Sequence, residues 1–119
     1  MIVIVTGSRT FNDYNKIKET MDSLTRPFAL WHGGAQGADE LAGIWASLYD
    51  VPVRVWLPDW ATLGKRAGVV RSAAMCDGAP PGSLVVAFIK RPISASPGTA
   101  ACIKAAKRAA LRVKEVATW

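Results

Sequence analysis

The sequence predicts an α/β fold in which helices cover both faces of a parallel five-stranded sheet, a three-layer arrangement. Short apolar runs rich in β-branched residues alternate with stretches whose apolar residues recur every three or four positions. Glycine and proline separate many of these runs. The 119 residues suit one domain, so we expect residues 1–119 to form a single unit with right-handed crossovers and strand order 3-2-1-4-5.

The five expected strands are spread evenly along the chain. The first is continuously apolar or β-branched and ends at Gly7, which suits a strand buried on both faces. Pro58 ends the third strand, and the last strand should lie at an edge. The expected strands are residues 2–6, 28–32, 51–57, 84–89 and 112–117.

Four helices are expected between these strands. Asn12 or Asp13 can cap the first, and Gly64 and Gly68 leave the start of the third uncertain. The fourth, residues 99–111, is rich in alanine. The predicted inward-facing stripes are Tyr14, Ile17, Met21 and Leu24 in the first helix, Leu41, Ile44, Trp45 and Leu48 in the second (residues 38–49), and Leu63, Ala67, Val70 and Ala74 in the third.

The net charge of +6 is unevenly distributed. All of the excess lies in residues 90–119, where seven Lys or Arg residues accompany Glu115 alone. Lys104, Lys107, Arg108 and Arg112 are spaced to line one exposed side of the last helix. No aromatic residue is interleaved to stack bases, so a solvated face is favoured over nucleic-acid binding, which stays open as a lesser alternative.

Cys76 and Cys102 are too few and too far apart to indicate a zinc cluster or a redox motif. We expect two buried free thiols, no metal and no cofactor. No apolar run approaches the roughly 20 residues that a bilayer requires, and no signal peptide is evident. A soluble cytoplasmic protein with no membrane partner is therefore expected.

Four polar or glycine-rich segments follow the first four strands, and the carboxyl ends of parallel strands form one rim where ligands bind. These segments are residues 7–10, 33–37, 59–60 and 94–99. Bare glycine loops that lead into helices expose backbone N–H groups, so Gly33, Gly34 and Gly98 could hold a phosphate. The glycine spacing matches neither the dinucleotide nor the P-loop pattern.

Charged side chains near this rim favour an anionic ligand. Arg9 and Arg71 can bind phosphate with two hydrogen bonds each, and Lys65 and Arg66 add two cations. Arg71 lies among small and apolar residues, so we expect it to have an anionic partner. Asp39 could contact a ribose or could act as a capping residue at its helix.

Two aromatic side chains at the same rim have simpler interpretations. His32 has no recognisable nucleophile partner, which favours a packed or backbone-bonded imidazole over a catalyst. Trp60 follows the third strand, where its indole could stack on a base.

Four segments in this order resemble the SLOG superfamily, in particular its small stand-alone branch related to YspA and YpsA. They are TGSR (6–9), HGGAQGAD (32–39), DWATLGKRAGVVR (59–71) and SPGT (96–99). The resemblance implies a Rossmann-like domain that binds a nucleotide or a nucleotide-derived ligand, in a bacterial or phage-infected cell. Its relatives include DNA-processing protein A and the Lonely Guy phosphoribohydrolases.

Rim chemistry and resemblance together give one set of candidate ligand-binding residues. The sequence departs from the usual pattern of the branch at Gln36, where relatives carry arginine, and at Ser72, where they carry asparagine. The set is Gly7, Ser8, Arg9, Gly33, Gly34, Gln36, Gly37, Asp39, Trp60, Lys65, Arg71, Ser96, Gly98 and Thr99.

The resemblance also suggests an enzymatic alternative. Lonely Guy enzymes use an arginine in R-K-x-x-M and a glutamate in P-G-G-x-G-T-x-x-E; Arg71 and Met75 match the first motif, but the acid falls on Cys102. A thiol cannot replace that carboxylate, which favours a sensor or sequestering protein over a nucleotide N-glycosidic hydrolase. The hydrolase stays open if Asp39 or Asp59 supplies the acid.

A homodimer is expected for two reasons. The chain has five tryptophans, including the terminal Trp119, and many relatives associate as homodimers.

Overall fold

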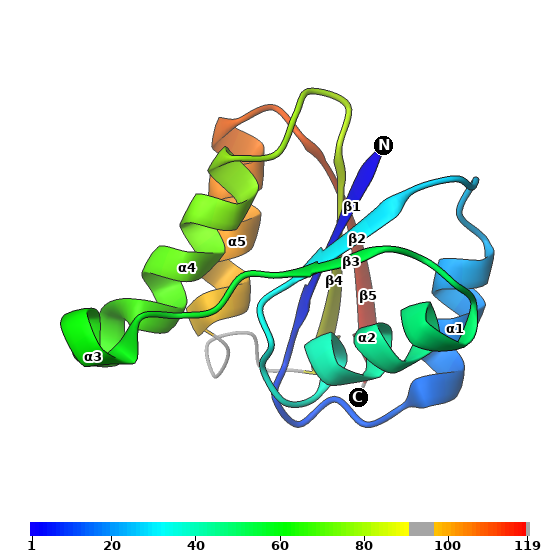
Figure 1. The fold of residues 1–119 in the computed structure, drawn as a ribbon, viewed down its shortest axis with the longest axis horizontal. Helices are drawn as coiled ribbons and strands as arrows, with labels where there is room; N and C mark the ends of the chain where they lie inside the picture. The colour runs from blue at the N-terminus through cyan, green and yellow to red at the C-terminus, as the bar shows by residue number, and fades with distance from the viewer. Residues whose placement is uncertain (91–96, 119) are drawn as a thin grey trace.

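The computed structural model describes residues 1–90 and 97–118 and confirms the α/β fold (Figure 1). Its five strands form one all-parallel sheet in the order β3-β2-β1-β4-β5. The strands are β1 (Ile2–Gly7), β2 (Ala29–His32), β3 (Val53–Val55), β4 (Leu84–Lys90) and β5 (Arg112–Thr118). The helices are α1 (Tyr14–Asp22), α2 (Ala38–Leu48), α3 (Trp60–Leu63), the 3₁₀ turn η1 (Gly64–Arg66), α4 (Ala67–Asp77) and α5 (Pro97–Arg108).

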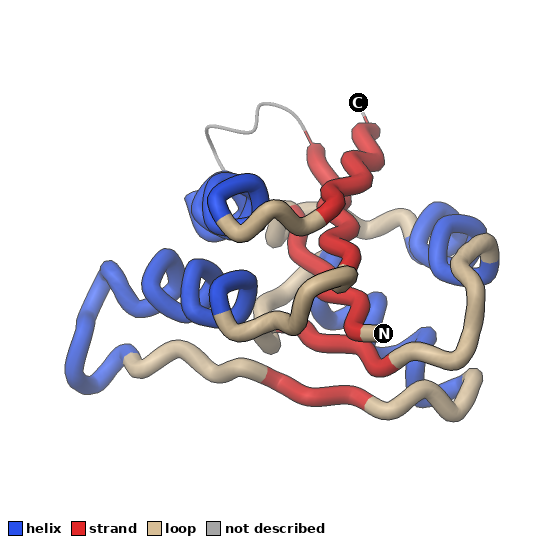
Figure 2. Tube along the Cα trace, turned by 90° about the horizontal axis from the view of Figure 1, so that it is seen from above, coloured by secondary structure: helices blue, strands red, loops and turns tan. Residues whose placement is uncertain are grey.

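Helices cover both faces of the sheet, with α1 and α2 on one side and α4 and α5 on the other (Figures 1 and 2). Side chains alternate between the faces along a strand. Val3 and Val5 of β1 therefore join the core beneath α1 and α2, and Ile4 joins the core beneath α4 and α5. All three are fully buried, so β1 is covered on both faces as its sequence predicted.

Helix α1 confirms the prediction made from its sequence. Asp13 is the cap, because its carboxylate accepts a hydrogen bond from the Lys16 N–H at 3.1 Å. Ile17 and Met21 are fully buried, and Tyr14 and Leu24 pack against the same core.

The inward face of α2 differs from the predicted stripe. Trp45 is buried, but Ile44 and Leu48 are 45% and 66% exposed. The helix instead lays Ala38, Ala42 and Ala46 on the sheet. Trp45 fills the space beside them, stacked on Phe28 and donating its indole N–H to Asp22 at 3.0 Å. Small residues allow the helix to approach the strands closely, which a count of large apolar residues does not anticipate.

The predicted third helix is interrupted. Ala67 of its stripe is buried as predicted, but the stripe is wrong at Val70 and Ala74. Gly64 adopts a positive φ of 58°, and the chain passes through α3 and η1 before α4 begins at Ala67. Helix α4 also turns a different side to the core from the one that the stripe required. Val70 and Ala74 face solvent, whereas Ser72, Met75 and Cys76 are buried.

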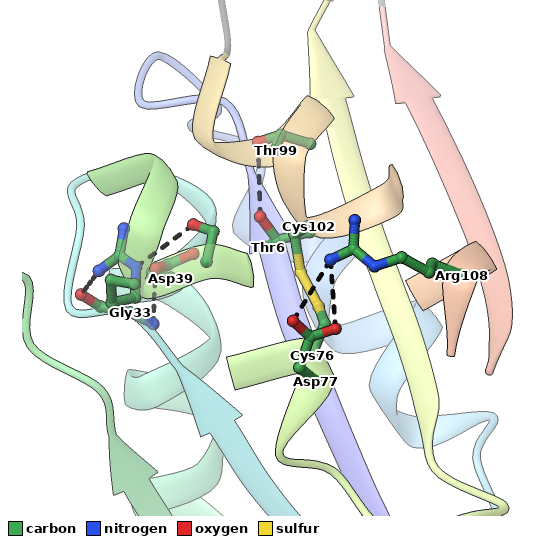
Figure 3. Close-up of a disulfide and its surroundings, with 10 residues drawn as sticks. Thr6, Gly33, Asp39, Cys76, Asp77, Thr99, Cys102 and Arg108 are labelled. Atoms are coloured by element: carbon green, nitrogen blue, oxygen red, sulfur yellow. Dashed lines mark hydrogen bonds and ion pairs between the residues drawn. A yellow bond between two sulfur atoms is a disulfide. The ribbon is translucent and has the colours of Figure 1, made fainter. Parts of the chain in front are cut away.

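Cys76 and Cys102 are both fully buried, as expected, but they form a disulfide that joins α4 to α5 (Figure 3). The expectation of free thiols is therefore wrong. The sequence separation of 26 residues gave no hint of the pairing, because only the packing of the two helices brings the Cα atoms to 6.0 Å. Among the described residues, no helix is both long and apolar enough to cross a bilayer.

The disulfide predicts the thiol content of the protein. Purified without reductant and unfolded in guanidinium, the chain should react with iodoacetamide at neither cysteine; after reduction it should react at both. By loop-closure entropy the bond should stabilise the fold by about 3 kcal/mol, measured as a loss of unfolding free energy on reduction. The variant Cys76→Ser should unfold identically with and without reductant. Two reactive thiols in the unreduced protein would contradict the assignment.

Candidate functional site

A pocket of about 210 Å³ opens at the carboxyl ends of the strands, at the rim where the strand order predicted a ligand. Its walls come from the end of β1 and the loop after it, from the loop after β2, and from α3, η1, α4 and the first turn of α5. Eight predicted residues line it: Gly7, Arg9, Asp39, Trp60, Lys65, Arg71, Gly98 and Thr99.

A second, more open hollow of about 450 Å³ adjoins the first. Arg9, Ala35, Trp60 and Arg71 line both, so the two hollows form one continuous site. Three further predicted residues line the second hollow alone: Gly33, Gly34 and Gln36. Ser96 lies outside the described residues.

Ser8 and Gly37 line neither hollow. The Ser8 hydroxyl is buried, donates to the Lys90 carbonyl at 3.3 Å and accepts from the Lys90 N–H at 2.9 Å. Gly37 has a positive φ of 79°, and a Cβ there would lie only 2.6 Å from the Arg9 carbonyl oxygen. The structure gives both residues a role in packing the loops that form the wall.

Arg71 is the half-buried cation at the junction of the two hollows. Its Nη1 donates to the carbonyls of Gly33 and Trp56, the latter at 3.2 Å, and its Nε donates to the Ser72 hydroxyl at 3.3 Å. Burial lowers the pKa of the guanidinium, and the field of Asp39 opposes that shift. The expected anionic partner is not in direct contact, because among the described residues no carboxylate oxygen lies within 4.0 Å of Arg71.

Asp39 fixes the glycine loop from the opposite side. Asp39 is 5% exposed, and its carboxylate accepts from the N–H of Gly33 at 2.9 Å (Figure 3) and from that of Ala35 at 3.3 Å. Burial raises its pKa to about 6, although the two N–H groups and Arg71 favour the charged form. Asp39 therefore fixes the loop before α2 and does not cap the helix, whose N-cap Gly37 has no side-chain cap hydrogen bond. A contact with ribose stays a prediction.

The N–H of Gly34 is also engaged, because it donates to His32 Nδ1 at 3.0 Å. His32 is thus a buried, backbone-bonded imidazole, as predicted, and burial lowers its pKa. The N–H groups of Gly33 and Gly34 are both used inside the loop, so a phosphate there would compete with Asp39 and His32 for them, and the contact stays a prediction. The loop is shaped by its own hydrogen bonds.

The first turn of α5 closes the pocket on the side of β1. Pro97 starts the helix, a position where its missing N–H costs nothing. The Thr99 hydroxyl accepts a long, 3.5 Å hydrogen bond from the Thr6 hydroxyl (Figure 3). The following N–H groups of a helix N-terminus attract anions. Gly98 and Thr99 line the pocket at this helix N-terminus, and their contact with a phosphate stays a prediction.

Seven lining residues of the first pocket were not among the predicted set: Thr6, Ala35, Gly68, Val69, Ser72, Met75 and Pro97. Ser72 and Met75 follow Arg71 in the matched motif, which was a usable signal. Thr6 precedes Gly7 at the end of β1. Within the described residues, no group of three or more His, Cys, Asp or Glu side chains could hold a metal ion.

The fold and the rim pocket define a Rossmann-like domain, and comparison with known sequences identifies its family. A sequence model described as the YspA, cpYpsA-related SLOG family matches residues 1–62. Gene 61 protein of Mycobacterium phage D29 is 34% identical over 120 residues, which cover 93% of this chain and 92% of that protein. No solved structure matches the chain. The chain belongs to the YspA, cpYpsA-related SLOG family.

The raised pKa of Asp39 predicts a pH dependence of stability. The pKa of the folded carboxyl is about 6, whereas the ordinary pKa of an accessible aspartate is 3.8. The folded state therefore binds more protons between these values, and the unfolding free energy should fall by about 3 kcal/mol as pH rises through them. Asp39→Asn keeps an oxygen acceptor but cannot titrate, so this decline should be missing from its urea-unfolding series. Parallel pH profiles for the two proteins would contradict the assignment.

Proposed function

We propose that the rim pocket binds the phosphate of a nucleotide or a nucleotide-derived small molecule. The observation that carries this proposal is the convergence of Arg9, Lys65 and Arg71 with the first turn of α5 on one pocket. Three cations and a helix N-terminus favour an anion, and a guanidinium suits the oxygen geometry of a phosphate.

The hydrogen bonds around Arg71 leave part of its guanidinium for a ligand. Nη1 and Nε are used within the protein, but among the described residues Nη2 has no acceptor. The half-buried position also makes a contact there stronger than on an open surface. Asp39 supplies the carboxylate that lines the pocket. Because this carboxylate already accepts from the N–H groups of Gly33 and Ala35, it competes less with a phosphate for the cations.

Membership of the SLOG family supports a nucleotide-related ligand, and the similarity to a mycobacteriophage protein supports a role in an infected bacterial cell. Sensing or sequestering a small molecule in the cytoplasm fits a pocket of this kind without requiring a catalytic centre. A homodimer stays a prediction, which light scattering can test.

A second candidate function is hydrolysis of a nucleotide's N-glycosidic bond, favoured by the position of Asp39 in the pocket. Cys102 is buried in the disulfide and does not line the pocket, so it cannot act on a ligand. Asp39 does line the pocket, with a pKa of about 6 that suits proton transfer near neutral pH. Asp59 instead caps α3 by accepting from the Thr62 N–H at 3.2 Å.

The hydrolase candidate predicts release of free base from a nucleoside monophosphate, followed by chromatography. Asp39→Asn should abolish the release because the amide cannot transfer the proton, while nucleotide binding should persist. Intact nucleotide after prolonged incubation with the wild-type protein would exclude this candidate and leave the binding function standing.

Nucleic-acid binding through α5 has less support than its sequence suggested. Lys104 and Lys107 are exposed, but Arg108 is paired with Asp77 at 3.3 Å, and Arg112 lies on β5 rather than on the helix. The predicted helical face is therefore wrong for Arg112, and the charge of Arg108 is partly neutralised by Asp77.

Calorimetry with nucleoside phosphates, cyclic nucleotides and ADP-ribose tests the proposed function. Lys65→Gln should weaken the best ligand about fivefold, because one partly solvated charge contact is lost. Its neighbour Arg66 belongs to the same 3₁₀ turn but lines neither hollow, so Arg66→Gln is the matched control and should change nothing. Failure of the whole panel to bind, or equal losses in both variants, would overturn the proposal.

A further inference from the structure

The two hollows of the rim differ in chemistry although they share four residues. The first holds Lys65, Asp39 and the start of α5, all of which are charged or carry backbone N–H groups. The second adds no charged side chain to the shared Arg9 and Arg71; its own lining is glycine backbone, one amide and apolar surface. A ligand that spans both therefore meets cations at one end and an uncharged wall at the other.

The apolar surface of the second hollow is unusually open. Leu57 is 76% exposed and Trp60 is 51% exposed, and Pro58 lies between them in the sequence. Large apolar side chains that border a hollow without covering each other indicate a place where a ligand removes them from water. Both residues belong to the segment that leads from β3 into α3, which lies near the N-terminal end of α4 (Figure 1).

Trp60 is held in position by the structure around it. Asp59 caps the helix that Trp60 begins, and Gly68 on α4 would place a Cβ only 3.6 Å from Trp60 Cη2. The indole thus lies beside Gly68 at the start of α4, where glycine leaves room for it, and about half of the residue stays open to a ligand. An aromatic ring in such a position offers a surface for stacking by a nucleobase.

Gln36 supplies the one uncharged side chain in this hollow that both donates and accepts hydrogen bonds. It lies in the loop between Gly34 and Gly37, whose positive φ angles and internal hydrogen bonds fix the backbone. A carboxamide pairs with the mixed donor and acceptor edge of a base, which an arginine at this position could only partly match.

We infer that the ligand lies across the rim with its base in the second hollow, stacked on Trp60 and read by Gln36, and its phosphate in the first. This inference rests on the proposed function, and it adds the orientation of the ligand and the residues that select the base. Arg9 and Arg71, at the junction, then face the sugar-phosphate link.

The decisive comparison is between the best-bound nucleoside monophosphate and ribose 5-phosphate, which lacks the base. Ribose 5-phosphate should bind the wild-type protein at least about tenfold more weakly than the nucleoside monophosphate, since the stacking of a base on an aromatic residue contributes about this factor. Trp60→Ala should weaken the nucleotide by a similar factor without affecting ribose 5-phosphate, and Trp60→Phe should retain most of the affinity. Leu57→Ala provides a second variant on the same wall that leaves α3 intact.

Base selection is tested with Gln36→Leu, which keeps the bulk of the side chain and removes its hydrogen bonds. The ratio of affinities among the adenine, guanine, cytosine and uracil monophosphates should fall towards one, while ribose 5-phosphate binds as before. If the nucleotide and ribose 5-phosphate bind equally well, or Trp60→Ala weakens both equally, the inference fails and the proposed function stands. If no phosphate compound binds, both fail.

Discussion

One half-buried guanidinium holds the carboxyl rim of the sheet together. Arg71, on α4, donates to the carbonyl of Gly33 after β2 and to that of Trp56 after β3, so three segments far apart in the sequence meet at one side chain. The contact requires glycine at position 33, because a Cβ there would overlap the guanidinium. The two carbonyls offset the loss of water around the charge. Asp39 then fixes Gly33 from the other side through its N–H.

This arrangement changes what the glycine-rich loop does. Its bare backbone looks suited to cradling a phosphate, yet its N–H groups are occupied by Asp39 and His32. The glycines serve close packing and positive φ angles, and the loop acts as a rigid wall. The cations that line the pocket come instead from the loop after β1, from η1 and from α4, beside the first turn of α5. The pocket is thereby left with cations on one side and open apolar surface on the other.

The fold could be predicted because each strand is recognisable from the pattern of its own residues. β-branched runs and the helix-period segments between them define a parallel sheet, and the rules of crossover then limit the strand order. Helix faces were harder to predict. In α2 the buried side carries Ala38, Ala42 and Ala46, whereas Ile44 and Leu48 are exposed, because small side chains let the helix approach the strands closely. In α4 the core took up Ser72, Met75 and Cys76 in place of Val70 and Ala74, so the buried side was set by packing against the sheet and not by the larger apolar residues.

The sequence by itself determined the α/β fold, the strand order and the rim on which a ligand site would lie, because periodicity and chain order are local properties. It also placed most of the pocket residues, including Arg9, Lys65 and Arg71. Only the tertiary structure decided how these groups are paired. Arg71 binds carbonyls rather than an acid, Asp39 binds the loop, and Cys76 meets Cys102 across two helices. Each pairing joins residues whose distance is set by packing, and no local pattern encodes that distance.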